Sequence, residues 1–416
     1  MKEKRVVITG LGAVTPIGVG VDNFLKGLNS GQNGIARVTR FDTADFSSQL
    51  AAEVKNFDPQ EWIEPKLSKR MDRFAQFAVA SSGMAIEDAG LNHFTFNSER
   101  AGVIIGSGIG GSQTIEDGYR LLSDRGPKSL SPFLISKLLI NMAACMTSII
   151  HGLKGPISAP SVACSSGANA IGDAFRIIQR SDADIMLAGG SEAAITPLAY
   201  GGFCATRSMS RRNDSPEIAS RPFDKNRDGF VMGEGSGILV LESLEHARQR
   251  KAKIYAELIG YGNAADAFHF TAPEASGEGM CRVMKQAIGD AGIKITDTNY
   301  INAHGTSTIL NDKIESLAIM KLFGEHVKNI KTSSIKSMMG HLLAAAGAVE
   351  CISTVLSIYT GMLPPTINYE TPDPDCPLSF VTGGAQLFNP EVAISNSFGF
   401  GGGNACLVFR KFGGEP

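Results

Sequence analysis

Short runs of β-branched and aliphatic residues alternate along the chain with longer segments of helical periodicity. Five of these apolar runs are predicted to be strands, at residues 6–8, 103–105, 185–187, 238–241 and 407–409. Helices are predicted over residues 73–88, 169–179 and 279–290. Strands that alternate with helices of this length indicate a layered α/β fold. The first strand is expected to run into a loop, because glycine and proline interrupt the apolar run between residues 10 and 18.

The second half of the chain repeats features of the first. Residues 85–91 (AIEDAGL) are echoed by residues 287–293 (AIGDAGI), and each segment precedes a predicted strand that ends in a loop. A glycine-rich turn then leads into an alternating strand near the end of each half, at residues 233–241 and 401–409. A duplicated unit accounts for both echoes.

The charged stretch 248–253 is the predicted boundary between the two copies. We therefore expect two halves, residues 1–253 with a candidate nucleophile and residues 254–416 with two candidate histidines.

Composition and charge exclude several classes of protein. The 416 residues carry a formal net charge of −2, so no global basic field attracts nucleic acid. The seven cysteines are scattered without a CxxC pair, which predicts a reduced, cytoplasmic protein without a disulfide framework or a zinc site. The apolar stretch 342–359 contains Glu350 and many small residues, so we expect a buried helix and no membrane span.

Residues 106–111 (GSGIGG) match the glycine pattern of a dinucleotide-binding loop and follow a predicted strand. The pattern also requires an acidic residue at the end of a second strand, and none stands at the expected distance. A dinucleotide site is therefore rejected.

The strongest candidate for chemistry is Cys164, which follows an extended stretch and immediately precedes a helix of small residues. The free N–H groups of a helix start favour thiolate over thiol, so this position predicts an activated nucleophile. His304 follows a predicted strand and His341 precedes a predicted helix. If the repeat is real, His341 is the counterpart of Cys164, and a histidine at a helix start is expected to be a neutral N–H donor.

These motifs, taken together, resemble the condensing enzymes of the thiolase fold, specifically the carrier-protein-dependent β-ketoacyl synthases. The resemblance spans nearly the whole chain and is carried, in order, by the segments 163–167 (ACSSG), 221–224 (RPFD), 229–235 (GFVMGEG), 302–308 (NAHGTST), 336–341 (KSMMGH) and 396–402 (NSFGFGG). It implies two duplicated halves in a layered α-β-α-β-α sandwich. Differences from the usual pattern at Ser165, Ser166 and Gly403 leave every reactive group in place.

The resemblance also implies the reaction. Cys164 would take an acyl chain from acyl-carrier protein, with the N–H groups of Cys164 and Phe400 as the oxyanion hole. His304 and His341 would stabilise the enolate that forms when malonyl-carrier protein loses CO₂. Lys336 would be the fourth polar member, with Glu315 as its partner. No cofactor is expected, since phosphopantetheine arrives on the carrier protein.

Further roles are implied by the same resemblance. The substrate-binding residues would be Ile109, Phe133, Thr306, Thr308 and Phe398. A monovalent cation would be held by Asn302, Ala303, Glu350, Ser395 and Asn396. Because carrier proteins are acidic, a basic rim is expected at Lys66, Lys69, Arg70, Arg125, Lys128 and Arg207. The expected assembly is a homodimer, and Ile109 favours a type II synthase.

Several alternatives share parts of this pattern. A polyketide-type ketosynthase or a type I synthase would use the same reactive residues. A coenzyme-A thiolase would need a different motif at residues 302–305 and a second cysteine before the late glycines, where this chain has Gly399 and Phe400. A Cys-His hydrolase needs only one histidine as general base, and a non-catalytic partner subunit would not need Cys164.

Overall fold

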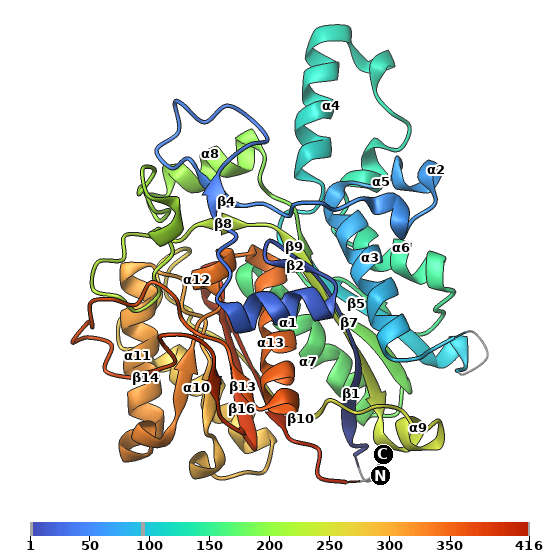
Figure 1. Ribbon diagram of the computed structural model, residues 1–416. Helices are drawn as coiled ribbons and strands as arrows, with labels where there is room; N and C mark the ends of the chain where they lie inside the picture. The colour runs from blue at the N-terminus through green and yellow to red at the C-terminus, as the bar shows by residue number, and fades with distance from the viewer. Residues whose placement is uncertain (1–2, 93–95, 415–416) are drawn as a thin grey trace.

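The computed structural model describes residues 3–92 and 96–414. Its centre is a mixed sheet in which the strands of the two halves lie side by side (Figure 1). The first half contributes, in spatial order, β1 (Val6–Thr15), β9 (Gly235–Ser243), β7 (Ile185–Glu192), β5 (Ala101–Gly106) and β6 (Ile157–Ser158). The second half contributes β10 (Ala256–Ala265), β17 (Gly403–Arg410), β16 (Val392–Phe398), β11 (Tyr300–Asn302), β12 (Lys331–Ser333) and β14 (Ser379–Phe380).

The pairing pattern is the same in both halves. β1, β9 and β7 pair antiparallel, and β7, β5 and β6 pair parallel. β10, β17 and β16 likewise pair antiparallel, and β16, β11 and β12 pair parallel. β1 meets β10 antiparallel at the centre of the sheet. The repeat in the sequence therefore corresponds to a repeat in topology.

Helices cover both faces of each half and produce five layers. α7 (Ser166–Gln179) and α13 (Ala346–Thr360) pack against each other and against strands of both halves. α3 (Arg73–Asp88) and α6 (Met142–His151) cover the outer face of the first half, while α10 (Glu278–Asp290) and α11 (Ile309–Phe323) cover that of the second. The predicted layered α/β fold is confirmed.

The first strand is longer than predicted, because its glycines allow a helix to pack closely on it and do not end it. β1 continues through Gly10 and Gly12, and α3 lies so close that a Cβ on Gly10 would stand 2.2 Å from the Ala85 carbonyl oxygen. Gly260 in β10 lies under α10 in the same way, with the Ala287 carbonyl oxygen 2.3 Å from the position of a Cβ. These glycines permit close packing of helix on strand and do not interrupt the strand.

The apolar segment Leu343–Thr360 is long enough to cross a membrane by length and composition. In the structure 89% of it is buried, and it forms the turn Leu343–Ala345 and then α13 in the middle layer. The expectation of a buried core helix is confirmed.

The remaining elements complete the fold around these layers. The other helices are α1 (Val21–Ser30), α2 (Pro65–Ser68), α4 (Ser112–Arg125), α5 (Leu134–Leu138), α8 (Pro197–Ala205), α9 (Leu244–Gln249) and α12 (Lys336–Met339). The other strands are β2 (Gly18–Val19), β3 (Ala36–Arg37), β4 (Leu50–Ala52), β8 (Met232–Gly233), β13 (Met362–Leu363) and β15 (Gln386–Leu387). α4 projects from the body of the molecule in Figure 1. The predicted boundary at residues 253 and 254 lies between α9 and β10.

Candidate active site

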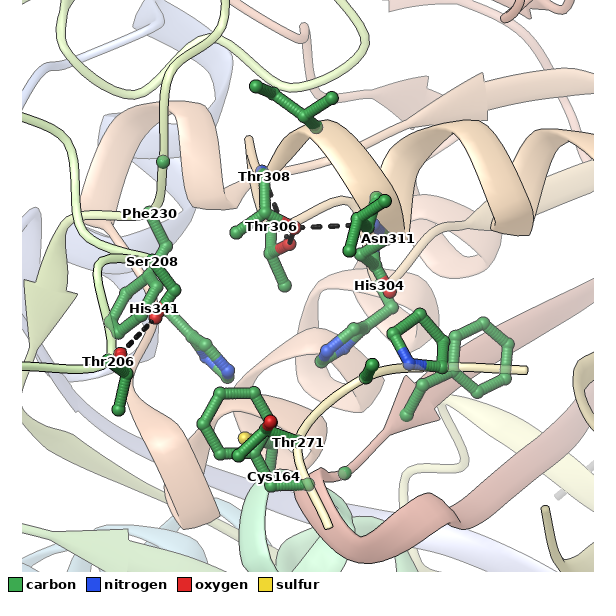
Figure 2. A pocket seen from close by; sticks show the side chains of 18 of the residues that line it. Cys164, Thr206, Ser208, Phe230, Thr271, His304, Thr306, Thr308, Asn311 and His341 are labelled. Atoms are coloured by element: carbon green, nitrogen blue, oxygen red, sulfur yellow. Dashed lines mark hydrogen bonds between the residues drawn. The ribbon is translucent and has the colours of Figure 1, made fainter. Parts of the chain in front are cut away.

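Cys164, His304 and His341 line one cavity of about 340 Å³, to which both halves contribute. Figure 2 shows the two imidazole rings turned toward each other, close to the cysteine sulfur. All three side chains are buried, so they meet at the inner end of the cavity. The three residues that the sequence singled out are therefore brought together.

Cys164 lies in a tight turn, Ala163–Ser165, that leads directly into α7. Ala163 has a φ of 47°, a left-handed conformation that costs a non-glycine residue energy and is found at functional turns. Two serines brace the turn. The Ser165 hydroxyl donates to the Val162 carbonyl at 2.9 Å, and the Ser166 hydroxyl donates to the Ala163 carbonyl at 2.7 Å.

Gly403 packs against Val162, the residue before this turn. A Cβ on Gly403 would lie 2.4 Å from Cγ1 of Val162. The serines and this glycine, which depart from the usual pattern, thus support the nucleophile through local packing.

Burial dominates the electrostatics of the nucleophile and raises the pKa of the Cys164 thiol to about 11. A hydrogen bond from the Phe400 backbone N–H and the positive charge of Lys336 lower this pKa, but they do not offset the burial. Burial therefore opposes the thiolate that the position at a helix start is expected to favour. The thiol is poised beside groups that stabilise negative charge once it develops.

The structural counterpart of Cys164 is Ala344, and the expectation that it is His341 is wrong. α13 is preceded by the turn Leu343–Ala345, just as α7 is preceded by Ala163–Ser165. The first residue of each turn has a left-handed φ, 51° at Leu343 and 47° at Ala163. His341 lies before this turn, in a short stretch paired with Val231 and Gly233.

The two histidines face each other with ring centroids 5.3 Å apart and nearly perpendicular planes. Burial and the nearby charge of Lys336 hold the pKa of both well below the ordinary value of 6.5, so both rings are neutral. Among the described residues, neither ring nitrogen of His341 has a hydrogen-bond partner. A buried, unpartnered N–H aimed into a cavity is suited to a ligand oxygen.

Lys336 supports His304 from behind. Its Nζ donates to the His304 carbonyl at 2.6 Å and lies 3.4 Å from Nδ1 of the same ring. An ammonium can only donate, so Nδ1 is the acceptor and the ring proton lies on Nε2.

The carboxylate that pairs with Lys336 is Glu350. The expectation of Glu315 in that role is wrong, because its two oxygens accept the backbone N–H groups of His304 and Gly305, each at 2.8 Å. Glu315 comes from α11 and fixes the histidine loop, whereas Glu350 comes from the middle-layer helix α13.

The residues expected at a monovalent cation site lie together behind the histidines. Four of their side-chain oxygens are buried and lack a hydrogen-bond partner within the described residues: Asn302 Oδ1, Glu350 Oε2, Ser395 Oγ and Asn396 Oδ1. Oxygen donors suit hard cations. The backbone of Ala303 lies in the same segment, and its side chain is buried.

A second cavity, of about 400 Å³, adjoins the first, and the surface exposed to it is almost wholly apolar. Phe203 and Phe400 line both cavities, which places them at the junction. Ile109 lines the second cavity, as expected for a wall of an acyl pocket. Phe398 lines the first, where its ring lies 5.7 Å from that of His304.

Phe133 is not in either set of lining residues. Its side chain is exposed, and the Arg70 guanidinium lies 4.6 Å from the ring centroid. Within one chain the structure does not bring it to the site.

The cavity mouth carries Thr306 and Thr308, whose hydroxyl oxygens lie 2.9 Å apart (Figure 2). Arg207 lines the same mouth and is exposed. The other residues expected in a basic rim are exposed on and after α2 and at the end of α4: Lys66, Lys69, Arg70, Arg125 and Lys128.

Sequence reasoning missed Glu192, a fully buried carboxylate at the end of β7. The signal was available, since Glu192 is an acidic residue two positions after the apolar run at residues 185–190 (IMLAGG). Phe203 and Thr271 were also missed; both line the two cavities, and no spacing relates them to Cys164.

Comparison with known proteins agrees with this geometry. The family described as "Beta-ketoacyl synthase, N-terminal domain" matches residues 3–247, and "Beta-ketoacyl synthase, C-terminal domain" matches residues 255–370. The chain is 51% identical to "3-oxoacyl-[acyl-carrier-protein] synthase 2" of Synechocystis over 99% of both chains. It is 49% identical to the protein of the same name from Coxiella burnetii, again over 99% of both.

Solved structures of ketosynthases have the same fold. A β-ketoacyl synthase from Burkholderia phymatum superposes with a TM-score of 0.92 at 37% identity and covers 98% of this chain and all of its own. A ketosynthase in complex with a type II polyketide acyl-carrier protein gives a TM-score of 0.91 at 37% identity, over 99% of this chain and all of its own. With matches of this length in both halves and a Cys-His-His site at their junction, the chain belongs to the β-ketoacyl synthase family.

Proposed function

We propose that this protein elongates fatty acids as a 3-oxoacyl-[acyl-carrier-protein] synthase of the type II class, with Cys164 as the acyl carrier. The observation that carries the assignment of roles is the meeting of one buried thiol and two neutral histidines in a single cavity. A hydrolase needs only one histidine as the base that activates water, whereas two neutral histidines in one cavity are suited to donate two hydrogen bonds to an enolate oxygen.

The first step is acyl transfer. The Cys164 sulfur attacks the thioester carbonyl of acyl-carrier protein, a new carbon–sulfur bond forms, and the pantetheine thiol leaves with the proton. The N–H groups of Cys164 and Phe400 are suited to the developing oxyanion. Their proximity is seen at Gly399, where a Cβ would lie 3.3 Å from the Cys164 nitrogen.

The second step is decarboxylation. Malonyl-carrier protein loses CO₂, and the electron pair of the broken carbon–carbon bond passes into an enolate whose oxygen accepts hydrogen bonds from His304 Nε2–H and His341. Neutral histidines are suited to this role, because a neutral imidazole donates a hydrogen bond to the oxyanion and keeps its proton. Lys336 supports this role by fixing the tautomer of His304.

In the third step the enolate carbon attacks the carbonyl of acyl-Cys164. The carbon–sulfur bond breaks, the cysteine leaves as thiolate, and the product is a β-ketoacyl chain two carbons longer on the carrier protein. The positive charge of Lys336 and the Phe400 N–H lower the cost of this leaving thiolate.

The cavities support a division of the substrate. The pantetheine arm would bind at the mouth with Thr306 and Thr308, and the acyl chain would extend past Phe400 into the apolar second cavity beside Ile109. The 51% identity to relatives named synthase 2 favours fatty-acid elongation over polyketide assembly, since the polyketide ketosynthase above is 37% identical.

A monovalent cation would fit behind the histidines. Asn302, Glu350, Ser395 and Asn396 would supply the unpartnered oxygens, and the Ala303 backbone lies beside them. Burial raises the pKa of Glu350 to about 7, and a cation would favour its ionised form, which pairs with Lys336. No cofactor has a role in the steps above.

We infer that the partner is an acidic acyl-carrier protein, which would dock on the exposed basic residues named above, and that catalysis takes place in the cytoplasm. We also infer a homodimer. Large apolar side chains are exposed on α4, α5, α6 and the edge strand β6, among them Tyr119, Ile135, Ile149 and Ile157. An exposed apolar surface next to an open sheet edge is typical of an interface. Sedimentation would test this assembly, and Ile149→Asp should shift it toward monomer.

Mass spectrometry tests the function most directly. Incubation with acyl-carrier protein should add one acyl group to Cys164, and malonyl-carrier protein should then remove it and yield a β-ketoacyl product. An acyl group that water removes equally well would indicate a hydrolase, and a chain that never takes up an acyl group would indicate a non-catalytic subunit.

A further inference from the structure

Glu192 lies at the end of β7 and is fully buried. Its carboxylate accepts three hydrogen bonds from the loop that follows β5. Ser107 Oγ donates at 3.0 Å, the Gly108 N–H at 2.8 Å and the Ile109 N–H at 3.3 Å. Among the ion pairs of the described residues none involves Glu192, so the loop itself is what balances the charge of this carboxylate.

This arrangement uses within the chain the N–H groups that the GSGIGG segment would need for a phosphate. Glycine-rich loops bind anions through backbone N–H groups that point into open space. Here a carboxylate of the same chain occupies those N–H groups. The fit is close, since a Cβ on Gly108 would lie 2.9 Å from Glu192 Oε2. The loop is held by an internal anion.

The opposite side of the loop is fixed by backbone. A Cβ on Gly110 would lie 2.7 Å from the Leu138 carbonyl oxygen, and a Cβ on Gly111 would lie 2.6 Å from that of Lys137. The Gly111 N–H also donates to the Leu138 carbonyl at 3.1 Å. The loop is therefore held between Glu192 and the end of α5, and Ile109 forms part of the wall of the second cavity.

We propose that Glu192 is a positioning residue that sets the acyl chain length of this enzyme by holding the Ile109 loop at the wall of the second cavity. The inference rests on the proposed function, in which that cavity takes the acyl chain. Glu192 lies outside the lining residues of both cavities, so its effect passes through the loop.

The chain offers a matched control in Glu315. It is also fully buried, and it accepts two backbone N–H groups of the loop after β11, the strand equivalent to β5. Burial raises the pKa of both carboxyls to about 7. The two residues differ in what they hold, because Glu192 holds the acyl-pocket wall and Glu315 holds His304.

The test is Glu192→Gln, assayed with a short and a long saturated acyl-carrier protein as primers. The amide places an NH₂ donor against the donor N–H groups of the loop, and this clash displaces the loop. Because Ile109 lines the second cavity, the displacement changes the wall of that cavity. We expect kcat/KM for the long primer to fall about tenfold more than for the short one, the size of a lost hydrogen bond to a charged group. Glu315→Gln should slow condensation to the same degree for both primers.

Ser107→Ala provides a second variant that keeps the buried charge and removes one donor, and it should shift the primer ratio in the same direction by less. If the ratio of kcat/KM for the long primer to that for the short primer is unchanged in both Glu192→Gln and Ser107→Ala, the proposal is overturned. Failure of the unmodified protein to elongate either primer would instead overturn the proposed function.

Discussion

The turn that begins α7 and the turn that begins α13 have the same backbone and opposite chemistry. Each starts with a residue of left-handed φ, and the two helices cross at small residues, so that a Cβ on Gly167 would lie 3.1 Å from the Ala348 Cβ and one on Gly347 would lie 3.0 Å from the Ala168 Cβ. One turn presents Cys164 to the cavity, and the other has Ala344, which lines neither cavity, at the equivalent position.

This difference shows how a duplicated scaffold acquires an asymmetric site. The first half supplies the nucleophile and the Ile109 loop, while the second supplies His304, His341 and Lys336. The duplication places a helix start at the same position in each half. The side chains at the two positions differ, so only the first half carries a nucleophile there. Under the proposed function, the acyl group would be held by the first half and the malonyl group would contact the histidines of the second.

The sharpest way to break this comparison is Cys164→Ala, which gives the two turns the same side chain. Acyl loading and condensation should both be abolished, because among the described residues no other cysteine lines the cavity. Intact-mass measurement after exposure to acyl-carrier protein checks the result. Cys204→Ala is a suitable control, since Cys204 lies beside Phe203 but does not line either cavity. Acylation of another cysteine in Cys164→Ala would contradict the assignment.

His304→Ala and His341→Ala test the contribution of the second half. Each should reduce condensation about 10²–10³-fold, the usual cost of a lost oxyanion donor, and should reduce acyl loading far less. The reason is that the hydrogen bond to the Cys164 thiol comes from the Phe400 N–H and from neither histidine ring. Single-turnover loading and condensation rates separate the two steps. Equal losses in both would mean that a histidine acts as general base for the thiol.

The sequence predicted the parts of this site that local chemistry determines. Cys164, His304 and His341 stand in motifs with glycine neighbours, and the helices at residues 73–88 and 279–290 have an apolar periodicity that their burial confirms. It failed where contacts over long separations decide. Glu315 and Glu350 are both acidic residues in apolar helices, and only the fold shows which of them reaches Lys336.

The same limit applies to backbone geometry. Gly10 was interpreted as a strand breaker, because the approach of α3 is not visible in residues 6–15. His341 was matched to Cys164 because both precede an apolar run, whereas the left-handed φ at Leu343 shows that the turn begins two residues later. The packing of α3 on β1 settled the first point, and the backbone of the turn before α13 settled the second.

Ile109→Phe sharpens the assignment of the acyl chain to the first half. The added ring would fill part of the second cavity, so long acyl primers should lose activity by about tenfold or more and short ones should be spared. Turnover across a primer series measures this. Leu387→Phe, an exposed position on β15, is the control for the same kind of side chain. Uniform loss across primer lengths would place the acyl chain elsewhere.

Charge reversal tests whether the carrier protein docks on the first half, where all six basic candidates lie. Lys69→Glu combined with Arg70→Glu should lower kcat/KM several-fold at low salt and flatten its dependence on ionic strength, since exposed charges act mainly on association. Lys26→Glu combined with Lys285→Glu makes the same change in charge on α1 and α10. Equal effects of the two pairs would mean that only net charge matters.

The pH dependence of the two steps should differ between the halves, and this is the smallest effect expected. Burial raises the pKa of Cys164 to about 11, so the thiolate fraction increases with pH throughout the neutral range, and alkylation of the free enzyme should increase with it, by up to tenfold per pH unit. The pKa values of His304 and His341 are instead lowered well below 6.5, so neither ring gains a proton between about pH 6 and 8.

Condensation by enzyme that is already acylated should therefore be flat over that interval. Rapid-quench measurement of product formed from acyl-enzyme and malonyl-carrier protein gives this rate directly, and iodoacetamide labelling of Cys164 gives the other. A condensation rate that falls as the pH drops through about 6.5 would reveal a histidine with an ordinary pKa. An alkylation rate already at its plateau at neutral pH would show that the helix start and Lys336 outweigh burial at Cys164, and that the first half holds a thiolate at rest.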